Sequence, residues 1–170
     1  MIIPRFLLCL SLLLLWGCSG NPIGKVKNSP VKLKEETTIG RLFDGYSHFT
    51  MTSWGQEEGG SNGTLVSASG IVATEFWDSP LEQDNPWDIP KVNTARLELR
   101  YLVDDKGTVS PESIVVTYIA SEEGVIDEVC ARQKGELVSG GCKVVRKGGN
   151  LADRLRKIYT ALEKERPLPL

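Results

Sequence analysis

Residues 96–103 constrain the fold more than any other stretch, because apolar and charged side chains alternate along them. Successive side chains of an extended strand point to opposite faces of a sheet, so the apolar side chains of this stretch share one face. They are Leu97, Leu99, Tyr101 and Val103. One apolar face and one polar face are typical of an antiparallel sheet that is covered on one side. We therefore expect residues 96–103 to form a strand whose apolar face meets helices.

Further strands flank this one in the sequence and predict a meander. Runs rich in β-branched, aromatic or alternating apolar residues occupy 50–56, 64–77 and 113–120. The Asn62-Gly63 pair is a strong hairpin signal between the first two runs, and residues 104–107 make a turn after the central strand. A short additional strand is expected at 142–146.

Amphipathic helices are predicted near both ends of the domain. The first begins at residue 38, and its apolar residues at i, i+3, i+4 and i+7 are Ile39, Leu42, Phe43 and Tyr46. The last begins after Asn150, and its apolar stripe consists of Leu151, Leu155, Ile158 and Leu162. We expect the outer face of that helix to carry Arg154, Arg156 and Lys157.

Together these elements predict an α+β domain over residues 38–166. In the expected architecture, an antiparallel meander sheet of about four strands carries the N- and C-terminal helices on one face. Residues 122–134 have apolar residues at helical spacing and predict a further helix. Residues 167–170, which are rich in proline, are expected to form a tail.

The N-terminus has the features of a secretory signal: one positive charge, a short apolar run and a small residue before a cysteine. The segment Leu15-Trp16-Gly17-Cys18 resembles the lipobox of bacterial lipoprotein precursors. This resemblance implies that residues 1–17 are a signal peptide, that cleavage occurs between Gly17 and Cys18, and that Cys18 carries lipid, including an expected third acyl chain such as palmitate. An uncleaved membrane anchor and an ordinary secretory signal are the alternatives.

Residues 18–37 are expected to be the lipidated N-terminus and a flexible basic tether, because Pro22, Pro30 and polar residues interrupt regular structure. Ser19 follows the lipidated cysteine, and the absence of Asp at that position resembles lipoproteins that are sent to the outer membrane. The expected location is therefore the bacterial cell envelope, with the domain anchored in the outer membrane and facing the periplasm.

Four cysteines are present, and the lipoprotein interpretation leaves two of them in the domain. Cys130 and Cys142 would lie in a compartment where disulfides persist, and a bond between them would contribute roughly 3 kcal/mol by restricting the unfolded chain. Free thiols remain the first alternative. A metal site is a poor alternative, because the only histidine, His48, is distant in sequence.

No motif of a hydrolase, a nucleotide-binding loop, a metalloprotease or a redox dithiol occurs in the sequence. With a single histidine and no buried carboxylate pair in view, we expect no enzyme, no catalytic residue and no cofactor. The formal net charge of −2 gives no electrostatic signal for nucleic acid. Three tryptophans are candidate binding residues, with Trp87 in a proline-rich loop over 78–90, and the other two are Trp54 and Trp77.

The mature chain also carries a looser pattern of core-type residues, consisting of Thr38-Ile39-Gly40, Tyr46, Phe49, Trp54 and a closing Ile158-Tyr159. This pattern resembles a group of small uncharacterised bacterial envelope proteins, and the resemblance implies a fold but no activity. The functional hypothesis is a membrane-anchored, non-enzymatic module that binds a protein partner or assists an assembly. The alternative is a binder of a small ligand or a cell-wall fragment through exposed aromatic residues.

Overall fold

The computed structural model of the chain describes residues 20–33, 36–59, 63–73, 92–120 and 123–170. The expected signal peptide, its cleavage site and Cys18 lie outside these residues. Within the described ranges, no helix combines the length and the apolar character that crossing a membrane would require.

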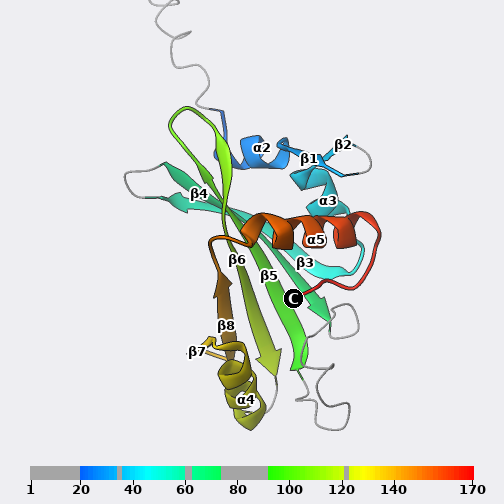
Figure 1. Ribbon diagram of the computed structural model, residues 1–170, viewed down its shortest axis with the longest axis vertical. Helices are drawn as coiled ribbons and strands as arrows, with labels where there is room; N and C mark the ends of the chain where they lie inside the picture. The colour runs from blue at the N-terminus through cyan, green and yellow to red at the C-terminus, as the bar shows by residue number, and fades with distance from the viewer. Residues whose placement is uncertain (1–19, 34–35, 60–62, 74–91, 121–122) are drawn as a thin grey trace, which may run out of the picture.

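The described residues form four helices and eight strands. In chain order these are α2 (Pro22–Lys27), β1 (Pro30–Lys32), β2 (Glu36–Thr38), α3 (Ile39–Gly45), β3 (Phe49–Glu58), β4 (Thr64–Ala73), β5 (Val92–Val103), β6 (Val109–Ala120), α4 (Glu123–Gln133), β7 (Glu136–Val138), β8 (Gly141–Arg146) and α5 (Leu151–Glu163). Helices α2, α3 and α5 lie against one part of the main sheet, and α4 lies beside the far part of β8 (Figure 1). The predicted α+β class is confirmed.

The main sheet has six antiparallel strands in the order β3-β4-β5-β6-β8-β7, and β1 and β2 form a separate two-stranded sheet. The predicted meander corresponds to β3 through β6. The predicted size of about four strands is too small, because β8 pairs with β6 and a hairpin then adds β7 at the edge. All three residues of β7 are exposed, so that strand has no burial pattern for a sequence reading to detect.

The central strand β5 has the predicted alternation. Leu97 and Leu99 are fully buried, and Tyr101 is 1% exposed, on the face that the helices cover. Strand β6 continues this face, because Leu97 pairs with Val116 and Leu99 pairs with Ile114. These paired apolar residues form the sheet face on which the helices pack.

The two predicted terminal helices form and pack on this face of the sheet. The side-chain oxygen of Thr38 accepts a hydrogen bond from the backbone N–H of Arg41 at 3.2 Å and caps α3. Helix α5 buries the stripe formed by Leu155, Ile158 and Leu162, as predicted. Its Tyr159 hydroxyl lies 2.6 Å from the hydroxyl of Tyr101 and joins the helix to the sheet.

The expected tether does not extend over all of residues 18–37, because α2 belongs to the core. Val26 in α2 is fully buried, and Val31 in β1 is 8% exposed. A Cβ atom at Gly40 would lie 2.9 Å from the Cβ atom of Lys27, so the absence of a side chain at Gly40 lets α2 approach α3 closely. Asn21 caps this short helix, and Pro22 occupies its first turn, where a missing N–H costs nothing.

The expected tail over 167–170 is likewise a packed segment, because Leu168 is fully buried in the hydrophobic core. The Tyr46 hydroxyl donates a hydrogen bond of 2.8 Å to the backbone oxygen of Arg166. The carboxylate of Glu165 accepts a 2.9 Å hydrogen bond from the Ser47 hydroxyl. The chain after α5 is therefore held against the end of α3.

Candidate ligand-binding cavity

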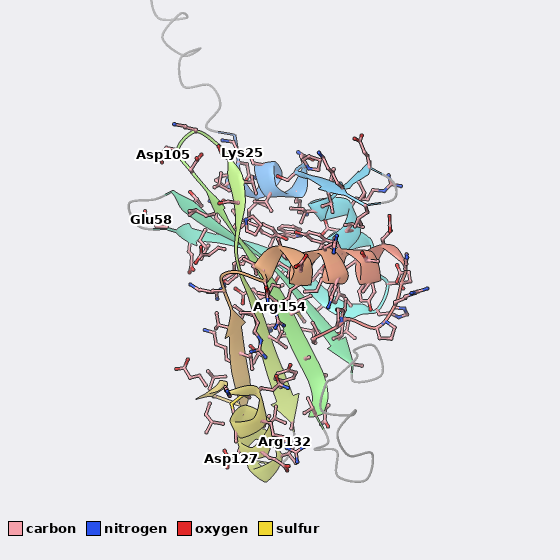
Figure 2. All side chains as sticks on the ribbon, in the orientation of Figure 1. Lys25, Glu58, Asp105, Asp127, Arg132 and Arg154 are labelled. Atoms are coloured by element: carbon pink, nitrogen blue, oxygen red, sulfur yellow. A yellow bond between two sulfur atoms is a disulfide. The ribbon has the colours of Figure 1, made fainter. Side chains whose placement is uncertain are left out.

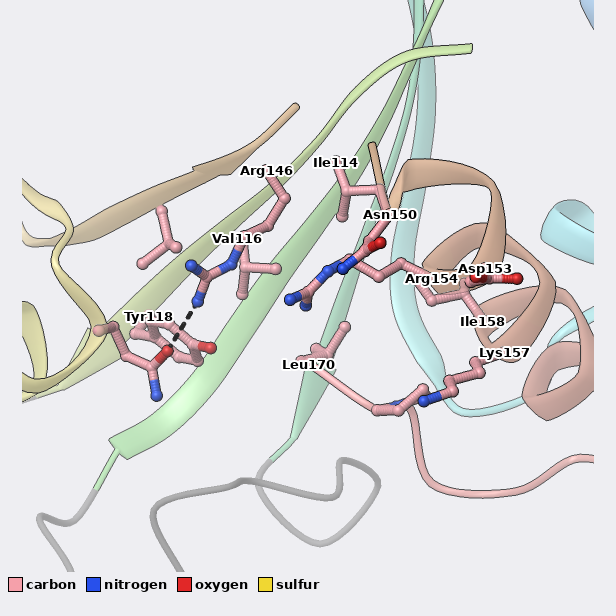
Figure 3. A pocket seen from close by; sticks show the side chains of 13 residues that line it. Ile114, Val116, Tyr118, Arg146, Asn150, Asp153, Arg154, Lys157, Ile158 and Leu170 are labelled. Atoms are coloured by element: carbon pink, nitrogen blue, oxygen red, sulfur yellow. Dashed lines mark hydrogen bonds between the residues drawn. The ribbon is translucent and has the colours of Figure 1, made fainter. Parts of the chain in front are cut away.

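A cavity of about 520 Å³ lies on the helix-bearing side of the sheet, between α5 and the part of β6 and β8 that leads to α4. Figure 3 shows its apolar floor on the strands and its polar side chains on the strands and α5. The position follows from the fold, because α5 covers only part of the apolar face and α4 packs beside β8 farther along.

The floor of the cavity comes from the period-two pattern of two paired strands. In β6 the helix-facing residues are Ile114, Val116 and Tyr118, which are 3%, 4% and 1% exposed. In β8 the partner of Val116 is Val144, which is 2% exposed. Side chains at alternate positions share one face, so these four residues form a continuous apolar surface.

Arg146 places a charge at the edge of that apolar surface. It follows Val144 by two positions in β8 and pairs with Ile114, so it lies on the same face as the floor. Its Nη2 atom donates a hydrogen bond of 3.0 Å to the Oε1 atom of Gln133, at the end of α4. This bond, drawn as a dashed line in Figure 3, holds the guanidinium over the cavity.

Helix α5 contributes two more cations, Arg154 and Lys157, which line the cavity beside the buried Ile158. In Figure 3 the guanidinium groups of Arg154 and Arg146 point into the space above Val116 from opposite sides. Figure 2 places Arg154 between two groups of charged residues, one near the β5–β6 turn and the other on α4.

The cavity has an excess of positive charge. Among the described residues that line it, Asp153 supplies the only side-chain carboxylate, and its Oδ1 atom lies 3.6 Å from the Nη2 atom of Arg156 on the same helix. No ion pair forms at Arg154 or Lys157 within the described part of the chain. Three cationic side chains therefore face one side-chain carboxylate that already has a neighbouring cation.

The field of Arg146 reaches the floor of the cavity. Burial raises the pKa of Tyr118 to about 12, and the positive charge of Arg146 opposes this shift. Tyr118 is therefore neutral at physiological pH and contributes an aromatic surface. The cavity therefore presents cationic side chains next to an apolar surface.

Chemically, this arrangement places cationic hydrogen-bond donors next to an apolar surface. Guanidinium groups donate directed hydrogen bonds to carboxylate or phosphate oxygens, and the apolar floor favours hydrocarbon. Within the described residues, no group of three or more His, Cys, Asp or Glu side chains is placed to hold a metal ion.

The predicted disulfide is confirmed: Cys130 in α4 and Cys142 in β8 are bonded, with their Cα atoms 5.3 Å apart. The bond fixes α4 to β8 next to the cavity, because α4 carries Gln133 and β8 carries Arg146. It is therefore placed to hold the hydrogen-bonded pair at the rim.

Of the three predicted aromatic binding residues, only Trp54 lies in the described part of the chain. Trp54 is half-buried, its indole N–H donates a 2.6 Å hydrogen bond to Oδ1 of Asp44, and Lys27 Nζ lies 4.8 Å from its ring centroid. Trp77 and Trp87 lie outside the described residues, as do Gly17 and Cys18. A binding role for these tryptophans stays a prediction.

The sequence reading did not identify the cations of the cavity. It assigned Arg154 and Lys157 to the outer face of the last helix, and both residues are exposed there, but they also line the cavity beside β6 and β8. A signal existed in Arg146, because the period-two pattern of Cys142, Val144 and Arg146 places a charge where an apolar residue is expected.

Comparisons of this chain with protein-family models, with curated proteins and with solved structures found no match.

Proposed function

We propose that this chain is a lipid-anchored protein of the bacterial envelope that acts by binding a small ligand, without catalysis. The observation that carries the binding role is the cavity, in which an apolar floor meets fixed cations. Its volume of about 520 Å³ falls within the range typical of small-molecule sites, which is about 300–1,000 Å³. The anchor rests on the lipobox-like segment Leu15–Cys18.

The test of the binding role is native mass spectrometry of the full-length protein, purified from envelope membranes in a mild detergent. We expect a co-purifying small molecule. We also expect it to disappear in Val116→Trp, which fills the floor, and in Gln133→Trp, which narrows the rim. Ser139→Trp, at an exposed turn away from the cavity, is the matched control. A spectrum without bound ligand, or loss of the ligand in the control alone, argues against a small-molecule role.

The anchor is tested separately by fractionation. We expect the native protein to sediment with the outer membrane and to incorporate labelled fatty acid, and the Cys18→Ala variant to lose that label. Incorporation of labelled fatty acid into the Cys18→Ala variant would contradict lipidation at this cysteine, because no other residue in the lipobox-like segment carries a thiol.

A protein-binding role is the second candidate, and exposed apolar residues favour it. Leu137 is 57% exposed, Val138 is 36% exposed and Val145 is 44% exposed, and these residues lie on the neighbouring strands β7 and β8. Such side chains at a sheet edge are suited to contact another protein. Crosslinking in membranes, with Leu137→Ser compared with wild type, tests this role: we expect a discrete partner that the variant loses.

A further inference from the structure

We infer that the ligand of the cavity is a small amphipathic anion, with a hydrocarbon body on the β6–β8 floor and a carboxylate or phosphate group between Arg146 and Arg154. This inference rests on the proposed binding function and names the chemical class of its ligand. It depends on the geometry of the two guanidinium groups relative to the apolar floor.

The apolar residues of the cavity floor determine which kind of ligand body can bind there. Ile114, Val116 and Val144 offer aliphatic side chains, and the neutral Tyr118 ring adds an aromatic surface. Apolar contact is favourable by roughly 25 cal/mol for each Å² removed from water. Because these four side chains are only 1–4% exposed, most of the area removed from water on binding is that of the ligand itself. A hydrocarbon chain or ring therefore fits this surface better than a sugar or a polar peptide does.

The cationic side chains at the edge of the cavity determine which polar group of a ligand can bind. Arg146 and Arg154 approach from different elements, β8 and α5, and both guanidinium groups point into the same space in Figure 3. Only one hydrogen bond, to Gln133, engages the Arg146 side chain in the described part of the chain, which leaves further N–H donors of the same guanidinium. Two cations that face one space repel each other, and an anion between them removes that repulsion while it accepts charge-assisted hydrogen bonds.

The remaining charges favour the same orientation. Lys157 lies one turn after Arg154 and adds a third cation to the helix wall of the cavity. The carboxylate of Asp153 lies 3.6 Å from Arg156, and both side chains are exposed. A cationic ligand would meet three like charges, whereas an anionic ligand would be attracted by them.

Calorimetry with four probes of equal chain length tests the inference: octanoate, octyl phosphate, octanol and octylamine. The full-length protein is used in one non-ionic detergent at a fixed concentration, so that partition of each probe into micelles is common to all variants. We expect the two anions to bind, octanol to bind at least about tenfold more weakly, and octylamine not to bind, because a charge-assisted hydrogen bond accounts for about one decade of affinity.

The charge variants identify the residues. We expect Arg146→Gln and Arg154→Gln each to weaken octanoate about tenfold, and the double variant to weaken it about a hundredfold. Arg41→Gln, which removes an exposed arginine of α3 that does not line the cavity, is the matched control and keeps wild-type affinity. A preference for octanoate supports a free fatty-acid type of ligand, and a preference for octyl phosphate supports a phosphate headgroup.

Three results would overturn the inference: equal affinities for octanol and octanoate, unchanged affinities in both arginine variants, or no binding of either anion. These results differ from failure of the proposed function. A neutral or cationic molecule seen in the native mass spectrum, and lost in Val116→Trp, would keep the binding role and reject the anion. A spectrum without ligand, together with no probe binding, would reject both.

Discussion

The helix-bearing face of the sheet has two parts that differ in what covers them. Beneath α2, α3 and α5, the side chains of Leu97 and Leu99 are fully buried against other apolar groups, such as Phe43. Between α5 and α4, the side chains of Val116 and Val144 are nearly as buried, yet charged groups on the rim share in their cover and a cavity lies above them. One alternating pattern of apolar residues thus forms a packed core in one part and the floor of a candidate site in the other.

The difference shows that burial of a strand face does not by itself distinguish a core from a binding surface. The part of α5 that covers a strand face decides whether that face is a core or a binding surface. The apolar stripe of α5 faces the packed part, whereas the flank that carries Arg154 and Lys157 overhangs the other part. Side-chain packing stabilises the first part, and we expect a ligand to complete the second.

The largest expected effect compares two leucines in the same C-terminal segment. Leu168 is fully buried in the core, whereas Leu170 is half-buried and lines the cavity. Leu168→Ala removes packed methyl groups and leaves a void, so we expect a loss of about 3 kcal/mol in the free energy of unfolding. We expect Leu170→Ala to lose less than about 1 kcal/mol, because less apolar area leaves a packed environment. Urea denaturation measures both, and equal losses would remove the distinction between the two parts.

Removal of the disulfide is expected to rank next. Cys130 and Cys142 are 12 positions apart, and opening a loop of that length costs about 3 kcal/mol in the chain-entropy model, with smaller values common. We expect the Cys130→Ala/Cys142→Ala double variant to be less stable in urea and to loosen α4 and β8 first. Hydrogen exchange locates the loss. Uniform loosening that includes β4 and β5 would show that the bond supports the whole domain and not only the cavity end.

The buried tyrosine pair predicts a pH dependence that originates in the packed part. Burial is the largest cause that raises the pKa of Tyr159 to about 12, from an ordinary value of 10.0, and burial also raises the pKa of Tyr101. The unfolded chain releases these protons first as the pH rises. The contribution to stability is therefore complete below pH 10 and is lost as the pH rises through about 12.

We expect Tyr159→Phe to cost about 1 kcal/mol at pH 8, because it removes the hydrogen bond to Tyr101. We also expect the variant to lose less stability than wild type between pH 10 and about pH 12, since one titrating phenol is gone. Chemical denaturation at a series of pH values measures both effects. An identical decline in wild type and variant would show that this tyrosine does not contribute to the dependence.

The smallest expected effect concerns the cations of the cavity. Arg154 forms no ion pair within the described residues, so Arg154→Gln should change the free energy of unfolding by less than about 0.5 kcal/mol in the absence of ligand. Lys27→Gln, which breaks the 2.7 Å ion pair with Asp44 in the packed part, should cost up to about 1 kcal/mol. Thermal unfolding separates them, and a larger loss in Arg154→Gln would mark that arginine as a structural residue.

Local patterns predicted much of the fold. Alternation predicted β5 and its hairpin with β6, helical spacing predicted α3 and α5, and the expected oxidising compartment pointed to the bond between Cys130 and Cys142. The sequence did not reveal that residues 22–27 are a core helix. That segment is short and begins with a proline, and its burial depends on the close approach at Gly40.

The cavity could not be predicted from the sequence either, because it too depends on tertiary packing. Its floor residues have the same pattern as core residues, and only tertiary structure shows where α5 ends its cover. Arg154 and Lys157 have the spacing of an ordinary solvated flank. The position of Arg146 within its strand did indicate a site, because it places a charge on the apolar face of β8. Strand β8 is short, so the alternation that reveals this charge spans few residues.

The most direct measurement is methyl NMR of the full-length protein during titration with octanoate. Val116 and Val144 report on the cavity floor, and Val66 and Val72, both fully buried, report on the packed part. We expect saturable shifts at the first pair and none at the second, with the shifts abolished in the Arg146→Gln/Arg154→Gln double variant. Shifts confined to Leu137 and Val138, or equal shifts in both pairs of valines, would contradict a ligand site between α5 and β8.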